Sequence, residues 1–191
     1  MTLRFLLLLT TAYLAGSINI SIGLFRLLGK KDPRDAFSGN PGVTNVYRLA
    51  GPAWALGVLL LEMGKAVFIA LLAHRLLSPG VVPWIGSGLI IGNRFPCFHR
   101  FSGGKGVANF LGFAAPLAPL AAGLGMLLWL AAFTLSRQPF IGSFALIAAL
   151  GIGMAAACGI GILPLSGTLV TVALIVHAHK KNIAGIRASA G

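Results

Sequence analysis

The chain has 191 residues, of which 57% are hydrophobic and only 9% carry a charged side chain. This composition excludes an ordinary soluble domain and is typical of a protein that crosses the membrane several times. Lys and Arg number 15 against 3 Asp and Glu. In a membrane protein this excess indicates basic cytoplasmic loops and an affinity for anionic lipids and phosphorylated substrates rather than for nucleic acid.

The first apolar segment runs from about residue 3 to residue 28. It is too long for the apolar region of a secretory signal peptide, so we predict a first transmembrane helix rather than a cleaved leader. A glycine, a proline and a cluster of charges over residues 29–35 end it.

Six further apolar segments follow, at about residues 52–77, 81–95, 106–115, 117–135, 140–158 and 160–177. The segments 81–95 and 106–115 are short. At about 1.5 Å per residue, neither comfortably crosses a hydrocarbon core of about 30 Å, so they either tilt, extend through their polar flanks or pair as a re-entrant hairpin. We predict an all-α integral membrane protein of about seven transmembrane helices, two of them short, in a single domain of residues 1–191.

Positive charges predict the orientation of the bundle. If the segments alternate sides, one side receives only Arg4 and Arg75. The other receives Arg26, Lys30, Lys31, Arg34, Arg48, Arg94, Arg100, Lys105, Arg137, Lys180, Lys181 and Arg187. The positive-inside rule then predicts an outer N-terminus and a cytoplasmic C-terminus.

A polar, turn-rich stretch, Ser38 to Arg48 (SGNPGVTNVYR), separates the first two long segments. Glycines around a proline allow a sharp turn that aims backbone N–H groups at one point, as in anion-binding nests. The candidate ligand-binding residues here are Ser38, Gly39, Asn40, Gly42, Thr44, Asn45 and Arg48, whose guanidinium suits phosphate. The alternative is a plain polar turn between membrane helices.

A second glycine loop, Ser102 to Gly106, precedes the segment 106–115. Its glycines Gly103, Gly104 and Gly106 place N–H groups near a helix N-terminus, which favours anions, and Lys105 adds a full charge. The loop is not a P-loop, because the upstream glycine and the hydroxyl residue after the lysine are missing. The alternative is a flexible turn whose lysine contacts lipid.

Three other places carry candidate chemistry. Glu62 and Lys65 lie at positions i and i+3 of one segment, where they either lock the helix to its neighbours or contact substrate. His179 and Asn182 follow the last segment, on the same predicted face as both loops. The histidine can accept a proton, bind phosphate or serve only as a polar cap at the membrane interface. Ser143 adds a hydroxyl or simply begins a helix.

The residue inventory narrows the reaction type. With three acidic residues and no Gly-x-Ser-x-Gly elbow, carboxylate acid–base chemistry and a serine triad are disfavoured. Cys97 and Cys158 are far apart and lack metal-ligand spacing, so we expect no metal and no cofactor. What remains is electrostatic stabilisation of phosphate by cations, amides and hydroxyls, with a histidine for proton transfer.

These motifs, together with Phe101 to Ala108 (FSGGKGVA), the Glu62 to Lys65 pair, Ile141 to Ser143 and His179 to Ile183 (HKKNI), resemble those of the bacterial acyl-phosphate-dependent glycerol-3-phosphate acyltransferases, the PlsY type. The resemblance spans essentially the whole chain. It implies a seven-helix inner-membrane enzyme, active on the cytoplasmic side, that transfers a fatty acyl group from acyl phosphate to the 1-hydroxyl of glycerol 3-phosphate. The products would be lysophosphatidate and phosphate, with no covalent acyl-enzyme.

Carried onto this sequence, the resemblance implies a site built from Ser38, Arg48, Lys105, Ser143, His179 and Asn182. The chain departs from the family pattern at Asn93 for histidine, Glu62 for aspartate, Ala66 for glycine and Gly185 for arginine, and Gly191 stands where the family ends in a glutamate-containing turn. A divergent paralogue with altered or lost catalysis, or a transporter of anions or lipid phosphates, is the alternative.

Overall fold

The computed structural model describes residues 2–189, and this part of the chain is helical with no strands. Two helices precede the first turn, α1 (Thr2–Ser17) and α2 (Ile20–Leu27). The remaining elements are η1 (Pro33–Asp35), α3 (Val43–Ala50), α4 (Pro52–Leu76), η2 (Pro79–Val81), α5 (Val82–Arg94), η3 (Cys97–His99), α6 (Val107–Ala114), α7 (Pro119–Ser136), α8 (Pro139–Cys158), α9 (Ile162–Ala178) and α10 (Lys180–Ser189).

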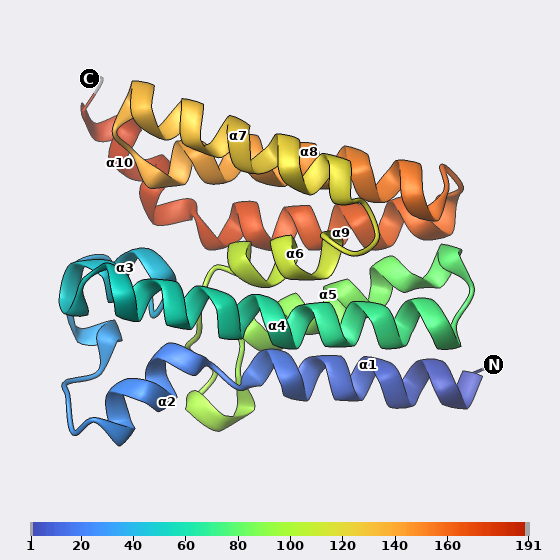
Figure 1. Ribbon diagram of the computed structural model, residues 1–191, viewed down its shortest axis with the longest axis horizontal. Helices are drawn as coiled ribbons and strands as arrows, with labels where there is room; N and C mark the ends of the chain where they lie inside the picture. The colour runs from blue at the N-terminus through green and yellow to red at the C-terminus, as the bar shows by residue number, and fades with distance from the viewer. Residues whose placement is uncertain (1, 190–191) are drawn as a thin grey trace.

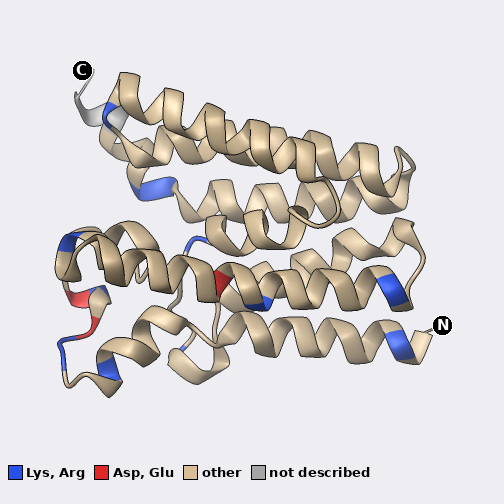
Figure 2. Cartoon of the chain, viewed as in Figure 1, with Lys and Arg blue, Asp and Glu red and all other residues tan. Residues whose placement is uncertain are grey.

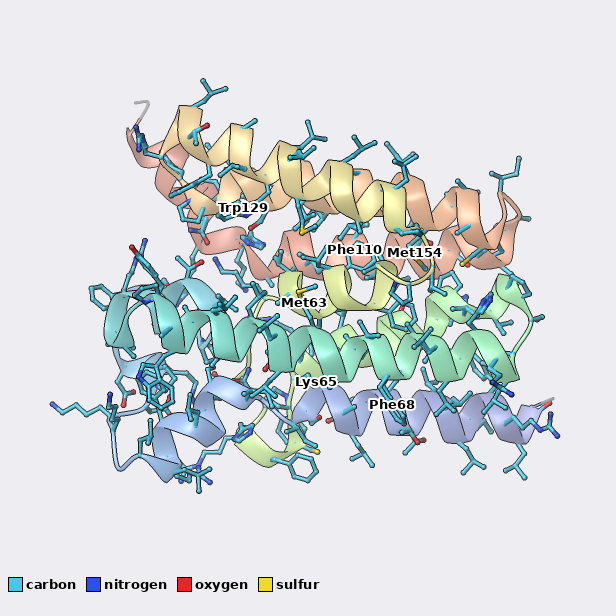
Figure 3. The ribbon with its side chains drawn as sticks, in the orientation of Figure 1. Met63, Lys65, Phe68, Phe110, Trp129 and Met154 are labelled. Carbon is cyan, nitrogen blue, oxygen red and sulfur yellow. The ribbon has the colours of Figure 1, made fainter. Side chains whose placement is uncertain are left out.

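The long helices run side by side in two groups, with α1 and α4 on one side and α7, α8 and α9 on the other (Figure 1). The short helices α5 and α6 fill the space between them. Helix α5 packs on α1 and α9, while α6 packs on α4 and α8. Phe110 of α6 and Met154 of α8 lie between the two groups (Figure 3), and each is only 2% exposed. The core therefore joins the groups through the short helices.

Three helices, α4, α7 and α8, are long and apolar enough to cross a membrane, and α1 with α2 could form a fourth span bent by 43°. Helix α9 is apolar but shorter. Large apolar side chains are exposed on the outer faces, such as Leu127 at 65% and Leu169 at 64%, as expected for lipid contact. The structure thus confirms an all-helical membrane protein, with three clear spans where the sequence predicts about seven.

The first predicted segment is not one continuous helix. It is interrupted after Ser17, and Asn19 begins a new helix by accepting a hydrogen bond from the Ile22 N–H. The backbone N–H of Ile20 donates to a Glu62 carboxylate oxygen at 2.9 Å. Because these side chains satisfy the backbone groups freed by the break, the chain can bend inside an apolar stretch.

The two short segments form an antiparallel pair. In Figure 1, α5 runs from the end of the bundle that holds the N-terminus toward the middle, and α6 runs back from the middle toward that end. Helix α5 has 13 residues and α6 has 8, too few for either to cross a membrane alone. This arrangement is compatible with a hairpin, and whether the pair spans or re-enters the membrane stays a prediction.

Basic residues gather at one end of the bundle, around α2, α3 and α10 (Figure 2). At the opposite end, Arg4 lies in the first turn of α1 and Arg75 in the last turn of α4. The charge asymmetry expected from the sequence is therefore an asymmetry between the two ends of the folded protein. The side of the membrane that each end faces stays a prediction.

Glycines bring α1 and α5 into close backbone contact. A Cβ added to Gly92 of α5 would lie 2.0 Å from the Tyr13 carbonyl oxygen, and one added to Gly16 of α1 would lie 2.1 Å from the Leu89 carbonyl oxygen. Small residues allow such approaches between helices in lipid. Since each clash is with backbone, a side-chain rotation cannot relieve it.

We expect Gly92→Ala to destabilise the protein by about 1–3 kcal/mol, because α1 and α5 must separate to admit the methyl group. Unfolding by SDS in mixed micelles measures the loss. Gly64→Ala on α4 is the matched control, since no atom lies within 4 Å of its added Cβ. Equal stability of the two variants would contradict the close-packing argument.

Candidate active site

A cavity of about 600 Å³ opens between α3, α4, α6, the α7–α8 turn and the end of α9. Its volume is in the range of small-molecule sites. The polar side chains that line it come from all the predicted motifs and several other places: Asn19, Ser38, Asn40, Thr44, Asn45, Arg48, Glu62, Asn93, Lys105, Asn109, Arg137, Gln138, Ser143, His179 and Asn182. Three polar patches far apart in the sequence thus meet at one place.

Most of the predicted site residues line this cavity, including the glycines Gly42, Gly104 and Gly106. Gly39 and Gly103 do not. Gly39 adopts a left-handed turn with φ of 66°, and a Cβ on Gly103 would lie 2.0 Å from the Asn93 carbonyl oxygen. These two glycines shape the loops rather than face the cavity. The structure therefore brings the predicted residues together, while their roles in binding and catalysis stay predictions.

The first polar stretch ends in a helix, where the sequence suggests only a loop. Helix α3 begins at Val43 after Gly42, which is in the extended conformation that precedes a helix. Thr44 therefore lies in the first turn of α3. Arg48 lies one turn farther, exposed at the cavity wall, with its guanidinium 5.8 Å from the centre of the Phe37 ring. A helix holds the backbone of Arg48 more rigidly than a loop would.

Lys105 links the second glycine loop to the C-terminal motif, because its ammonium donates a hydrogen bond to the Asn182 side-chain oxygen. The loop is fixed nearby by a bond of 2.9 Å from the Gly104 N–H to the Asn93 carbonyl oxygen. Burial lowers the pKa of Lys105 to about 8, and repulsion from Arg94 and Arg48 adds to this effect. Near pH 7 the side chain is a partly desolvated cation, which suits an anionic ligand.

His179 is a buried histidine, 2% exposed, at the end of α9. Its Nδ1 lies 2.8 Å from the Ile175 carbonyl oxygen, and its ring packs 5.2 Å from the Phe144 ring. A carbonyl only accepts, so Nδ1 carries the proton and Nε2 keeps its lone pair. Burial lowers the pKa of His179 to about 4. The imidazole is therefore neutral at physiological pH, with Nε2 as a hydrogen-bond acceptor.

Two predicted ligand groups are partly engaged within the protein. The Asn45 amide nitrogen donates to the Pro33 and Ala36 carbonyl oxygens at 2.7 and 3.0 Å. The Ser143 hydroxyl donates to the Pro139 carbonyl oxygen at 3.0 Å, within the first turns of α8. Asn45 therefore supports the fold of its loop at the same time as it lines the cavity.

Glu62 and Lys65 take part in a structural network. The Glu62 carboxylate lies 2.8 Å from the Lys65 ammonium and accepts a hydrogen bond of 2.7 Å from the Asn109 amide on α6. With the Ile20 bond described above, this carboxylate joins α2, α4 and α6. Lys65 also donates to the Ile18 carbonyl oxygen at the break between α1 and α2. The pair locks the helices, and Glu62 lines the cavity as well.

Sequence reasoning missed part of the lining. Asn109 and Asn93 were not singled out as site residues, although a buried asparagine in an apolar segment is a usable signal. The sequence also does not reveal the apolar wall of the cavity, because its residues are of the types found in any membrane helix. It consists of Val58, Leu59, Leu111, Met126, Trp129, Phe140 and Leu146, with Trp129 on the inner side of α7 (Figure 3).

The departures from the family pattern have different surroundings. Asn93 is buried at the cavity and Ala66 is fully buried in the core. Gly185 lies on the exposed surface of α10 with open space around it. Gly191 lies outside the described residues. Among residues 2–189, no group of three metal-binding side chains comes together, and Glu62 is the one carboxylate in the cavity wall.

A bundle of apolar helices around a cavity with one cationic and one apolar wall defines an integral membrane protein suited to amphiphilic anions. The model of the glycerol-3-phosphate acyltransferase family matches residues 6–189. The chain belongs to that family, and therefore to the membrane acyltransferases of phospholipid synthesis.

Individual proteins agree with this assignment. The glycerol-3-phosphate acyltransferase of Methylobacillus flagellatus is 39% identical over 181 residues, which cover 90% of this chain and 88% of that protein. Two crystal structures of PlsY, an integral membrane glycerol 3-phosphate acyltransferase, match 97% of this chain and 93% of theirs. The glycerol 3-phosphate form has a TM-score of 0.89 at 31% identity, and the lysophosphatidic acid form 0.86 at 30%. The family resemblance seen in the motifs is confirmed.

Proposed function

We propose that the protein transfers a fatty acyl group from acyl phosphate to the 1-hydroxyl of glycerol 3-phosphate. The observation that carries this proposal is the meeting of Arg48, Lys105, His179 and Asn182 at one cavity that also has an apolar wall. Both substrates carry phosphate, and one carries a long apolar chain. The cationic wall suits the phosphates and the apolar wall suits the chain.

In the proposed reaction, the 1-hydroxyl oxygen attacks the carbonyl carbon of the acyl phosphate. The new ester C–O bond forms, the bond from the carbonyl carbon to the phosphate oxygen breaks, and inorganic phosphate leaves. The hydroxyl proton ends on the released phosphate, either directly or through the neutral Nε2 of His179. Lys105 and Arg48 stabilise the charge that grows on the leaving phosphate. No covalent acyl-enzyme is needed.

Other groups position the acceptor substrate. Asn182 accepts a hydrogen bond from Lys105. Because His179 is three residues before Asn182, this bond fixes the position of the lysine relative to the histidine. We assign the glycine loops to the acyl phosphate, and His179 with Asn182 to glycerol 3-phosphate. Preorganised donors of this kind cost no rearrangement when charge develops, which is their catalytic advantage.

We place the reaction at the cytoplasmic side of the inner membrane. The end of the bundle that carries the cavity-lining loops is also the more basic end (Figure 2). The positive-inside rule assigns such an end to the cytoplasm, where glycerol 3-phosphate is available. Accessibility of single cysteines introduced at Lys31 and Thr2 to a membrane-impermeant thiol reagent in intact cells tests this orientation.

The direct test uses the purified protein in lipid nanodiscs with palmitoyl phosphate and labelled glycerol 3-phosphate. We expect 1-acyl lysophosphatidate and an equal amount of phosphate, with little product from acyl-CoA or acyl carrier protein. Positional analysis of the product by NMR distinguishes the 1-ester from the 2-ester. Binding of both substrates without product would favour a silent paralogue, and uptake of anions into liposomes would favour a transporter.

The pKa of Lys105 predicts a pH dependence of substrate binding. Below pH 8 the side chain is protonated and attracts the phosphate group of the acyl phosphate. As the pH rises through about 8, the proton leaves and binding weakens, by up to about tenfold per pH unit. Titration calorimetry from pH 6.5 to 10 measures the dissociation constant. The Lys105→Met variant should bind weakly with no such dependence, and a flat profile for the unaltered protein would contradict the assignment.

A further inference from the structure

The short turn η1 is connected to the helix that carries Arg48. The Asn45 side chain on α3 donates to the carbonyl oxygens of Pro33 and Ala36, on either side of the turn. Arg48 lies three residues farther along the same helix and so on nearly the same face. Any shift of the turn is therefore transmitted to the base of Arg48.

The same turn is connected to the loop that carries Lys105. The Arg34 guanidinium donates through Nη1 to the carbonyl oxygens of His99 and Ser102, each at 2.9 Å. Ser102 is three residues before Lys105. Because residues 34 and 102 are far apart in the sequence, this side chain is a direct link between the two predicted motifs.

Asp32 holds the guanidinium in place. Its carboxylate accepts from Arg34 Nε at 2.9 Å and from Nη2 at 2.6 Å. A planar guanidinium can bond both carboxylate oxygens and two carbonyls through four N–H groups in fixed directions, whereas an ammonium has only three donors. The hydrogen bonds from Arg34 hold the pKa of Asp32 below its ordinary value, so the pair stays ionised at neutral pH.

The loop after η3 needs such support. Arg100 and Phe101 both have left-handed backbone conformations, with φ of 55° and 53°. Side chains other than glycine adopt this region at a cost, and they keep it only where the surroundings hold them. The Arg34 bonds to His99 and Ser102 enclose these two residues on both sides. Arg34 and Asp32 do not line the cavity themselves.

We propose that Arg34 is a positioning residue that sets the separation of Arg48 and Lys105 by joining the turn beneath α3 to the loop before Lys105. It touches no substrate and acts through the two cations. The catalytic part of this inference rests on the function proposed above. Its structural part does not, since it concerns where Lys105 lies.

Loss of Arg34 should change the surroundings of Lys105. A relaxed loop lets water reach the ammonium, so the pKa of Lys105 rises from about 8 toward its ordinary value. The charged groups around it are Arg94 and Arg48, with His179 also near enough to feel the lysine charge and Glu62 in the cavity wall. None of them is altered by the substitution, so a shift reports the loop.

The test compares Arg34→Gln and Arg34→Lys with Lys31→Gln, an exposed cation in the same loop. Two readouts are measured on the full-length protein in nanodiscs. The first is the turnover number with palmitoyl phosphate and glycerol 3-phosphate, for which we expect a loss of about 100-fold in both Arg34 variants and none in Lys31→Gln. The second is the pH midpoint of Lys105 acetylation by acetic anhydride, followed by mass spectrometry, which should move upward.

The outcomes separate the two proposals. Full turnover in Arg34→Lys, or an unchanged midpoint in Arg34→Gln, would overturn the positioning role. An unaltered protein that makes no lysophosphatidate, with a midpoint that still shifts in Arg34→Gln, would overturn the function and leave the link intact. If Arg34→Gln does not fold, Asp32→Asn keeps one oxygen acceptor, replaces the other with an NH2 donor and removes the charge. It should lose about tenfold in turnover and shift the midpoint in the same direction.

Discussion

Replacing Lys105 with alanine is expected to lower the turnover number by about 100- to 1,000-fold while the protein stays folded. The ammonium lies in the wall of the cavity, where burial lowers its pKa to about 8, and it reaches Asn182 from the second glycine loop. Its loss removes a charge aimed at the leaving phosphate in a poorly solvated site, where electrostatic interactions are strong. Phosphate release from palmitoyl phosphate in the presence of glycerol 3-phosphate measures the effect.

Lys31→Ala is the matched control for this prediction. Lys31 is exposed on the same basic end of the bundle and does not line the cavity. If general attraction of anions to the basic surface explained the activity, both variants would lose similar amounts and added salt would reduce the difference. A Lys105→Ala enzyme with full turnover would remove the lysine from the proposed site.

Replacing Glu62 with glutamine is expected to destabilise the protein by about 3–5 kcal/mol. The glutamine keeps the shape of the side chain but leaves the Lys65 ammonium without its carboxylate partner, and the Lys65 side chain is only 15% exposed. The substitution also weakens the bonds to Ile20 and Asn109 that join α2 and α6 to α4. Unfolding in SDS mixed micelles measures the free energy.

A double variant separates this buried pair from a general effect of the site. In Glu62→Gln with Lys65→Met, no unpaired charge remains, so the double variant should be more stable than Glu62→Gln alone. Additive losses would show that the two side chains act independently. Such additivity would contradict the structural lock and return Glu62 to the candidates for direct substrate contact.

The sequence was sufficient for the architecture in outline and for the polar motifs that line the cavity. Apolar runs separated by charged turns predict helices α4, α7, α8 and α9 within a few residues, because a helix that crosses the bilayer needs a long stretch of apolar residues. The motifs around Arg48, Lys105 and His179 are continuous in sequence and carry their chemistry locally. Family membership followed from them and was confirmed by the family model.

Other features depend on contacts between residues that are distant in the chain. The break after Ser17 is stabilised by Glu62, more than 40 residues away, so the apolar pattern alone predicts an unbroken helix. Helix α3 is short and polar, and packing of the buried Val46 against α4 stabilises it as a helix. The bonds of Asn45 to Pro33 and Ala36 are likewise not visible in the sequence, while its role as a ligand stays a prediction.

By itself, then, the sequence determined which stretches enter the membrane and which short motifs carry cations and flexible backbone, since hydrophobicity and turn chemistry are properties of neighbouring residues. Only the tertiary structure decided that these motifs share one cavity, that an apolar wall from α4, α6, α7 and α8 adjoins them, and that Arg34 ties two of them together. These features depend on the packing of helices and on single long-range hydrogen bonds, which leave no periodic signal in the sequence.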